Sequence, residues 1–376
     1  MRLPPRVDNP LTTLCLTAAL SVAFVVVLLA RRDWNPTSFV QVGSLAASRD
    51  SHPPGFVVLE GVVGYDGRYF YQLALHPFAP PRQGMSIRLD PPAYRQQRIF
   101  YPMLVHFASL GKMDLVPWGL IAVNLAALCL LGYLGGVYAH LLGLPALWGI
   151  VLPLHVGFVT TLSRDLSEIV ECTLVIAGLL AYRRQRFWAT GVLLSLAVLT
   201  KEPALLAAAG IGLADLIINR RVSRGTWITA GLPLLVYLSW HLWLIAYWGA
   251  DSLNLGGSNQ GWPFSGYWNA LSWGIWHWHW PWALFCLQLT VMVAAVLLVP
   301  SRTRATVSER WAWALYALLI FSLSTEVWAD NHAFVRASSE LSLLSAIILL
   351  GAELPRVRWL LVMNVLLCIA AASQVV

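Results

Sequence analysis

The sequence has few charged residues and few cysteines for its length of 376 residues. Charged residues make up 11% of the chain and hydrophobic residues 58%, whereas soluble domains carry about 25% charged residues. This shortage of charge excludes an ordinary soluble domain. The five cysteines lie within hydrophobic runs and lack the spacing of a zinc site. We therefore expect them to be small core residues, with neither a disulfide framework nor a structural metal.

Long hydrophobic runs make up most of the chain. They predict an all-α, polytopic transmembrane bundle of about eleven helices. The run 11–30 is followed by Arg31 and Arg32 and has no small-residue cleavage site, which indicates a membrane anchor rather than a removed signal peptide. The expected spans are roughly 11–30, 114–139, 145–161, 165–182, 187–200, 203–219, 226–248, 281–299, 310–328, 337–352 and 359–375.

The basic residues are distributed unevenly between the short loops, and this distribution predicts the topology. With the N-terminus in the cytoplasm, thirteen of them lie on the cytoplasmic side and three on the other, Arg164, Lys201 and Arg336. Because they interrupt hydrophobic segments and form no soluble basic patch, nucleic-acid binding is not expected. The thirteen are Arg2, Arg6, Arg183, Arg184, Arg186, Arg220, Arg221, Arg224, Arg302, Arg304, Arg310, Arg356 and Arg358.

Two long segments are then external, within a single integral membrane domain over residues 1–376. The segment 31–113 is too long for a plain connection, and its apolar part 99–110 predicts a juxtamembrane helix in the interface. The segment 249–280 is rich in Gly, Asn and Trp. Its tryptophans fit an interfacial belt, with sugar stacking as the alternative. Spans 187–200 and 203–219 are short, so either the bilayer is thinned there or Lys201-Glu202-Pro203 lies within a cavity.

The most informative polar stretch lies in the first external segment, at Gly64–Ala74. Asp66-Gly67 is a turn signal, and Phe70, Leu73 and Ala74 then follow a helical spacing. A carboxylate is thus predicted at the start of a short amphipathic helix. Asp66 has two interpretations, a helix N-cap, which contributes about 1 kcal/mol, or a catalytic base.

Further ionisable residues gather at the same predicted membrane level. Charged residues in membrane spans are costly and usually face a cavity or a partner. Each also has a structural alternative: a helix-dipole contact for Asp165, mutual neutralisation of Lys201 and Glu202, pairing of Arg336 with Asp330 or Glu340, and headgroup contacts for Arg95 and Arg98. The residues at this level are Arg164, Asp165, Glu168, Glu171, Lys201, Glu202, Glu326, Asp330, His332 and Arg336.

The chemistry that suits this arrangement is transfer of a sugar from a polyprenyl phosphate. A base must take the proton of the acceptor hydroxyl, for which Asp66 is the candidate. Cations must stabilise the departing phosphate, and the candidates are Arg95, Arg98, Lys201 and Arg336. No cofactor is required by the spacing, although Asp66, Asp165 and Glu168 could offer oxygen ligands to Mg²⁺ or Mn²⁺.

The stretch Tyr65–Ala74 resembles the first-loop motif of GT-C membrane glycosyltransferases. It is most similar to the PIG-V-like mannosyltransferases and to bacterial cell-surface glycopolymer proteins. The stretches 92–102, 163–168 and 199–206 also look like that bacterial group, in the same order. The chain departs from the PIG-V pattern in having Gly64-Tyr65 where Trp usually precedes the Asp, and in lacking a large C-terminal soluble domain.

The resemblance implies a GT-C fold, Asp66 as the catalytic base and a polyprenyl-phosphate sugar donor. We expect an inverting enzyme in the cytoplasmic (inner) membrane of a bacterium, with its active site facing outward and a glycan or lipid as acceptor. A transporter or flippase of a lipid-linked glycan is the alternative, and a non-catalytic membrane partner is a third. The predicted substrate-binding residues are Tyr65, Arg68, Arg95, Arg98, Arg164, Asp165, Glu168, Lys201, Glu202 and Arg336.

Overall fold

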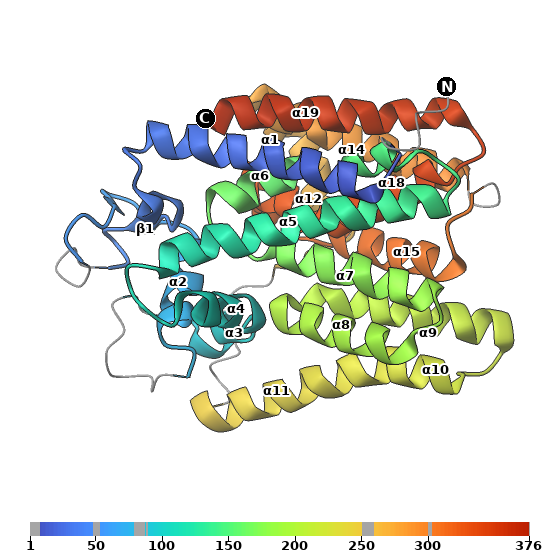
Figure 1. The fold of residues 1–376 in the computed structure, drawn as a ribbon, viewed down its shortest axis with the longest axis horizontal. Helices are drawn as coiled ribbons and strands as arrows, with labels where there is room; N and C mark the ends of the chain where they lie inside the picture. Colours follow the sequence, from blue (N-terminus) through green and yellow to red (C-terminus); the bar gives the residue numbers. More distant parts are fainter. Residues whose placement is uncertain are drawn as a thin grey trace.

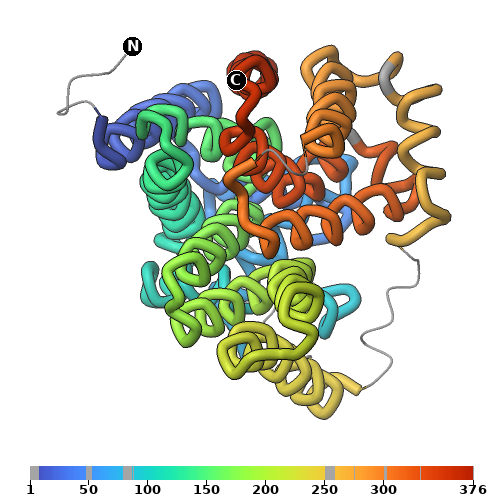
Figure 2. The backbone as a smooth tube through the Cα atoms, turned by 90° about the vertical axis from the view of Figure 1, so that its right-hand side faces the viewer, coloured from blue at the N-terminus to red at the C-terminus, as the bar shows by residue number. Residues whose placement is uncertain are grey.

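The computed structural model describes residues 8–47, 53–78, 87, 89–249, 259–299 and 303–375. The described chain is mostly helical, and most of the long helices run along the same axis (Figure 1). Figure 2 shows many of these helices end-on. The all-α prediction is confirmed. Arg2, Arg6 and Arg302, which entered the topology prediction, lie outside the described residues.

Six helical segments of the described chain are long and apolar enough to cross a membrane. This agrees with the multi-pass prediction by length and composition. Three of them are single helices, α1 (Pro10–Arg31), α5 (Val116–Leu141) and α14 (Trp280–Leu298). The others each join a short turn to a longer helix, and their bounds are Glu202–Asn219, which contains α9 (Leu205–Asn219), Arg224–Trp248, which contains α11 (Leu232–Trp248), and Pro355–Val375, which contains α19 (Trp359–Val375).

The other helical elements are shorter, and some of them are the turns of the three composite segments. They are α7 (Glu168–Arg183), α8 (Phe187–Thr200), α15 (Val307–Phe321), α16 (Thr325–Ala329), α17 (Asn331–Ala337) and α18 (Ser339–Leu350), with smaller turns at η4 (Glu202–Ala204), α10 (Arg224–Thr226), η5 (Trp227–Gly231), α12 (Ser265–Asn269), η7 (Ala270–Gly274), α13 (Ile275–His277) and η8 (Pro355–Arg358).

Two expected spans are not continuous helices. The segment 145–161 divides into the 3-10 turn η3 (Ala146–Val151) and the helix α6 (Val156–Ser163). Pro153 lies between them, and a proline lacks the N–H that a continuous helix needs. The segment 310–328 is likewise interrupted, because α15 ends at Phe321 and α16 begins at Thr325. The boundary predictions for these two spans were therefore wrong.

The described parts of the first long loop pack against α5 and α7 around a shared apolar core. They contain η1 (Pro36–Phe39), the strands β1 (Val42–Gly43) and β2 (Val58–Leu59) paired in parallel, and the helices α2 (Gly67–Leu75), α3 (Pro92–Gln96) and α4 (Phe100–Ser109). Tyr71 of α2 and Tyr101 of α4 are buried in this core. A helix was predicted over 99–110 and α4 confirms it, while its position in a membrane interface stays a prediction.

Close packing of backbones holds the bundle together beside α1. Gly135 of α5 lies against Gly149 of η3, and a Cβ added to Gly135 would come within 2.3 Å of the carbonyl oxygen of Gly149. No larger residue fits at this crossing without a backbone shift. Small residues at helix crossings are typical of membrane bundles. This packing places α6 and the start of α7 inside the bundle, where the polar site forms.

Candidate functional site

A polar cavity of about 620 Å³ lies where the first loop meets the helix bundle. Segments that are distant in sequence contribute to its walls: the residue before α2, α3 and the turn after it, the first residue of α7, η4, residues 259–260, the end of α15 and the α16–α17 region. Seven of the predicted site residues line it, namely Asp66, Arg95, Arg98, Glu168, Lys201, Glu202 and Arg336. The sequence-based grouping of these side chains at one level therefore corresponds to a single cavity.

Asp66 stands immediately before α2, but its side chain does not cap that helix. It occupies the N-cap position with helical dihedral angles and forms no side-chain hydrogen bond to the helix N-terminus. The N-cap interpretation of the Asp66 carboxylate is therefore wrong. The preceding Gly64 has a φ of +86°, and a Cβ there would clash with the Gln41 carbonyl oxygen. Gly64 thus lets the chain turn sharply and direct Asp66 into the cavity.

Two arginines bind the two oxygens of the Asp66 carboxylate. Arg336 donates from Nη2 to Oδ2 at 2.8 Å, and Arg95 donates from Nη1 to Oδ1 at 3.2 Å. Burial raises the pKa of the Asp66 carboxyl, but the positive charges of Arg336 and Arg95 outweigh this effect and bring the pKa to about 2. Asp66 is consequently ionised at neutral pH and is a weak base while both arginines hold it.

A chain of buried ion pairs extends from Arg336 into the bundle. Arg336 also donates from Nη1 to Oε1 of Glu168 at 3.3 Å. The same Glu168 oxygen lies 3.6 Å from Nζ of Lys201, which in turn lies 3.4 Å from Oε1 of Glu340. Glu168 and Glu340 are each 2% exposed. Lys201 and Glu202 therefore do not merely neutralise each other, and Arg336 is not confined to Asp330 or Glu340.

Glu202 instead forms a two-pronged pair with Arg98. The Nη2 and Nε atoms of Arg98 lie 2.8 and 3.1 Å from the two carboxylate oxygens of Glu202. Arg98 also stacks on the ring of Tyr94 with its guanidinium 5.3 Å from the ring centre. Arg95 and Arg98 are thus directed into the cavity by Asp66 and Glu202, so headgroup contacts are not needed to explain them.

The helix α11 fixes the segment that carries these two arginines. The indole of Trp240 donates to the carbonyl oxygen of Gln97 at 3.2 Å, and Nε2 of His241 lies 3.1 Å from Oε1 of Gln97. Gln97 lies between Arg95 and Arg98 in the chain. This support could not be predicted from the sequence, because nothing in the local pattern of 226–248 indicates a partner more than 140 residues earlier.

Four predicted substrate-binding residues do not line the cavity. Tyr65 lies behind Asp66, with its ring 5.1 Å from the Arg336 guanidinium and 5.4 Å from that of Arg164. Arg68 is buried and donates to the Tyr69 hydroxyl at 2.6 Å, so it supports α2 from within the first loop. Asp165 is fully buried at a left-handed φ of +53°, and the described residues provide no hydrogen bond to its carboxylate.

Glu340 is the main residue of this network that the predicted site omitted. It follows Arg336 by four positions, and residues spaced i, i+4 on a helix share one face. That spacing was the available signal, although α17 ends at Ala337 and α18 begins at Ser339. Glu326 and Asp330 also line the cavity, and both had been assigned to the same membrane level.

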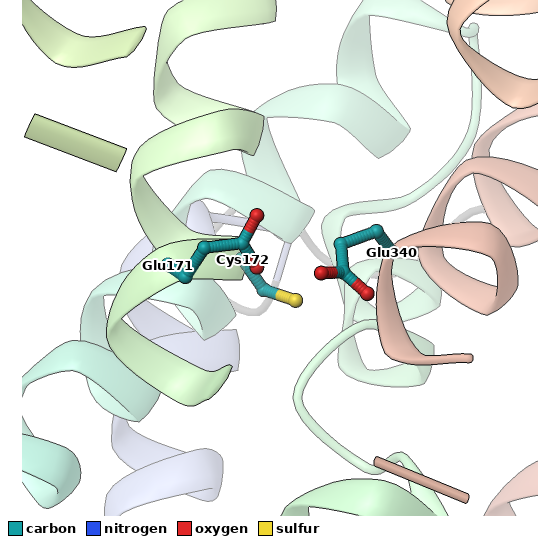
Figure 3. Close-up of side chains that lie close together, drawn as sticks. All are labelled: Glu171, Cys172 and Glu340. Atoms are coloured by element: carbon teal, nitrogen blue, oxygen red, sulfur yellow. The ribbon is translucent and has the colours of Figure 1, made fainter. Parts of the chain in front are cut away.

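A group of three buried ligand-type side chains lies outside the cavity lining (Figure 3). Within the described part of the chain it is the one cluster close enough to hold a metal ion, with its ligand atoms within 4.8 Å of one another: Glu171, Cys172 and Glu340. The ammonium of Lys201 already lies 3.4 Å from Glu340, which disfavours a second cation. Of the oxygen ligands suggested by the sequence, Asp66 and Glu168 share Arg336 instead, and Asp165 lies outside the cavity lining.

Comparisons with known proteins identify no relative of this chain. No protein-family model, no curated protein and no solved structure matches it. The geometry of the cavity therefore carries the functional argument by itself.

Proposed function

We propose that this protein is an integral membrane glycosyltransferase of GT-C type. It transfers a sugar from a polyprenyl-phosphate donor to a glycan or lipid acceptor at the outer face of the cytoplasmic membrane. The observation that carries the proposal is the Asp66 carboxylate, held by Arg336 and Arg95 at the wall of a 620 Å³ cavity. The multi-pass helical bundle supports it, because a lipid-linked donor presents its phosphate at the membrane surface.

The cavity offers four cations that suit the oxygens of a phosphate, beside five carboxylates. Guanidinium groups match the geometry of phosphate oxygens and bind them in a two-pronged manner. Arg95, Arg98, Lys201 and Arg336 all line the cavity. Each already has a carboxylate partner at 3.6 Å or less, so an incoming phosphate competes with these carboxylates for the positive charge.

This competition gives Asp66 a way to become an effective base. While Arg336 and Arg95 contact its two oxygens, the pKa of the Asp66 carboxyl is about 2, because their positive charges lower the pKa more than burial raises it. When the donor phosphate draws the guanidinium groups toward itself, the lowering effect weakens and the pKa of the carboxyl rises. Donor binding therefore prepares the base for proton transfer.

The transfer step needs no covalent intermediate. The acceptor hydroxyl oxygen forms a bond to the anomeric carbon, and its proton passes to a carboxylate oxygen of Asp66. The bond from that carbon to the phosphate oxygen breaks, and its electron pair leaves on the phosphate. Arginine and lysine side chains stabilise the charge that develops there. A single direct displacement inverts the configuration at the anomeric carbon.

The test is a transfer assay with purified protein and a panel of polyprenyl-phosphate sugars, with and without EDTA. We expect release of free polyprenyl phosphate with one donor class, and the EDTA arm decides whether Mg²⁺ or Mn²⁺ contributes. Because Arg336 already occupies Asp66 and Glu168, we expect activity to persist in EDTA. A panel that contains every common sugar and yields no release contradicts the proposal.

A flippase of a lipid-linked glycan is the second candidate, and the depth of the ion-pair chain favours it. Lys201, Glu168 and Glu340 are almost fully buried within the bundle, and buried ionisable residues of membrane proteins often mark transport pathways. A translocation assay in liposomes separates the two functions. Movement of a lipid-linked glycan across the bilayer without release of polyprenyl phosphate would favour the flippase.

A further inference from the structure

A second, smaller hollow lies beside the cavity and has a different character. Its volume is about 240 Å³, and its walls include Arg32, Arg164, His279 and His332. Arg164 stacks on the face of the Tyr65 ring and so does Arg336 of the cavity, at 5.4 and 5.1 Å. The hollow therefore lies next to the cavity, and the Tyr65 ring contacts Arg164 of the hollow and Arg336 of the cavity.

Among the described residues neither arginine of the hollow forms a direct ion pair, although the charge of Asp165 acts on Arg32 and that of Asp330 acts on Arg164. Arg32 donates to the carbonyl oxygens of Ser38 and Ser163 at 3.2 and 3.4 Å, and Arg164 contacts Nε2 of His332 at 3.0 Å. In the described ranges no carboxylate oxygen lies within 4.0 Å of either guanidinium group. The arginines of the main cavity each have a direct carboxylate partner, so the guanidinium groups of the hollow are more open to an added anion.

An apolar groove lies next to the hollow, on the side of the bundle. Its volume is about 350 Å³, and it is formed by α1, α6 and α19 with part of α5. Its lining is almost entirely apolar and includes Phe24, Val27, Phe158, Ile369 and Ala372. The helix α6 contacts both α1 and α19, and in Figure 2 the blue α1 and the red α19 lie on the same side of the molecule.

The groove and the hollow follow each other along the same three helices. The lining passes from Val27 of α1 to Arg32, the residue after that helix, and from Leu162 of α6 to Arg164, the residue after that helix. On α19 it passes from Ser373 directly to Gln374. Together they form one composite site with an apolar groove and a basic end. This site complements the shape and charge of a lipid with an anionic headgroup.

We propose that this composite site binds an anionic phospholipid of the surrounding bilayer. Its phosphate lies against Arg32 and Arg164, and one acyl chain lies in the groove between α1 and α19. The bilayer is the source because the groove is lateral: Leu20 and Val27 of α1 and Ile369 of α19, all of its lining, are 43%, 44% and 58% exposed on apolar helices. The proposal does not depend on the glycosyltransferase assignment.

The test uses delipidated full-length protein in detergent micelles titrated with phosphatidylglycerol or phosphatidylcholine, with binding followed by native mass spectrometry. We expect saturable binding of phosphatidylglycerol at least tenfold tighter than that of phosphatidylcholine. Arg164→Gln and Arg32→Gln are each expected to weaken phosphatidylglycerol binding roughly tenfold, because each removes one charge-assisted contact. Arg221→Gln, at an exposed arginine outside the hollow, is the matched control and leaves binding unchanged.

A second variant keeps the proposal falsifiable if an arginine variant fails to fold. Ala372→Phe fills the groove and leaves the basic hollow intact, so it is expected to weaken phosphatidylglycerol binding as well. Equal binding of the two phospholipids, or unchanged binding in Arg164→Gln and Ala372→Phe, overturns the proposal. Preferential binding of a polyprenyl phosphate at this site overturns the assignment to a bilayer phospholipid.

Discussion

The two ends of α7 carry two ion-pair clusters that serve different purposes. Glu168 is the first residue of the helix and Arg183 the last, so about 22 Å separates them at 1.5 Å per residue. Glu168 joins Arg336 and Lys201 beside the 620 Å³ cavity. Arg183 pairs with Glu309 at 3.3 Å. One helix thus links a cluster at the cavity to a cluster at the opposite end.

The Glu309 cluster is complete within the fold. The Oε1 atom of Glu309 accepts hydrogen bonds from the Tyr138 hydroxyl at 3.0 Å and from Arg183. Its Oε2 accepts from the backbone N–H of Thr306 at 2.7 Å, as part of a capping box at the start of α15. Both oxygens of the buried carboxylate have partners, which is the usual condition of a structural ion pair.

The cluster at the cavity is incomplete by comparison. One oxygen of Glu168 and one of Glu340 have no hydrogen-bond partner among the described residues. Asp66, Arg95 and Arg336 keep side chains that are 17–23% exposed. Open charged groups over a cavity cost stability unless a ligand completes their contacts. The difference between the two ends indicates that the cavity cluster, unlike the Glu309 cluster, leaves acceptor oxygens open to a ligand that donates hydrogen bonds, such as a hydroxyl group.

The largest expected effect is the loss of transfer activity when Asp66 of the cavity cluster is replaced. Asp66→Asn removes the proton acceptor and keeps the size of the side chain, so transfer falls by about 10²–10⁴-fold. The protein stays folded and inserted, because Arg336 retains Glu168 as a partner. Initial rates of polyprenyl-phosphate release, with thermal unfolding as the folding check, measure this. A variant rate within twofold of wild type refutes the role of Asp66 as the base.

The next largest effect concerns Arg336, which bridges Asp66 and Glu168. Arg336→Gln removes the charge that faces the donor phosphate and is expected to lower kcat/KM about 10²-fold. Arg336→Lys keeps the charge but cannot contact both carboxylates in the same fork geometry, so its loss is smaller than that of the glutamine variant. Donor saturation curves for the three proteins provide the comparison. Equal kcat/KM in all three removes Arg336 from the phosphate site.

A smaller expected effect is a difference in pH between the acid limbs of the kcat and kcat/KM profiles. In the free enzyme the pKa of Asp66 is about 2, so kcat/KM loses no base as the pH falls toward 4. Under the proposed mechanism the donor phosphate shares the two arginines and raises the pKa of the Asp66 carboxyl, so we expect the acid limb of kcat to lie at higher pH than that of kcat/KM. Coincident limbs in the two profiles contradict the exchange of partners.

The same pKa sets the sign of a pH effect on stability. The Asp66 carboxyl has its pKa lowered in the folded protein, so its ion pairs stabilise the fold above the ordinary carboxyl pKa. That stabilisation is lost as the pH falls from about 3.8 toward 2. Thermal unfolding of wild type and Asp66→Asn across this range measures it. The difference in melting temperature between the two proteins should narrow toward pH 2, and a constant difference argues against the ion pairs.

The smallest expected effect on rate comes from the structural cluster. Glu309→Gln weakens the contact with Arg183 and one bond to the Thr306 capping box, at a cost of about 1–3 kcal/mol in the free energy of unfolding. Its transfer rate should match wild type at a temperature where both are folded. A loss of activity equal to that of Asp66→Asn would erase the distinction between the two ends of α7.

Much of the fold and part of the site could be predicted from the sequence. Hydrophobic runs with helical length identify most helices, since spans must satisfy their backbone hydrogen bonds internally. Seven predicted site residues line one cavity because charged residues near a membrane must converge on a polar space. The interruption at Pro153 was also visible in the sequence, yet the apolar composition of 145–161 concealed it.

The pairing partners could not be predicted, because they depend on contacts between distant segments. Arg336 reaches Asp66 across 270 positions, and Gln97 reaches Trp240 across 143. Arg68 and Asp165 are polar residues within the predicted motifs, yet they turn away from the cavity into the protein interior. A motif indicates that a residue matters, and only the packing decides whether it faces a ligand or supports its neighbours.

A structure of the wild-type protein with bound polyprenyl phosphate, determined by cryo-electron microscopy, tests the central claim most directly. The account predicts phosphate density in the large cavity between Arg95 and Arg336, with Asp66 released from at least one of them. Phosphate density confined to the hollow at Arg32 and Arg164, with the Asp66 ion pairs unchanged, would contradict it.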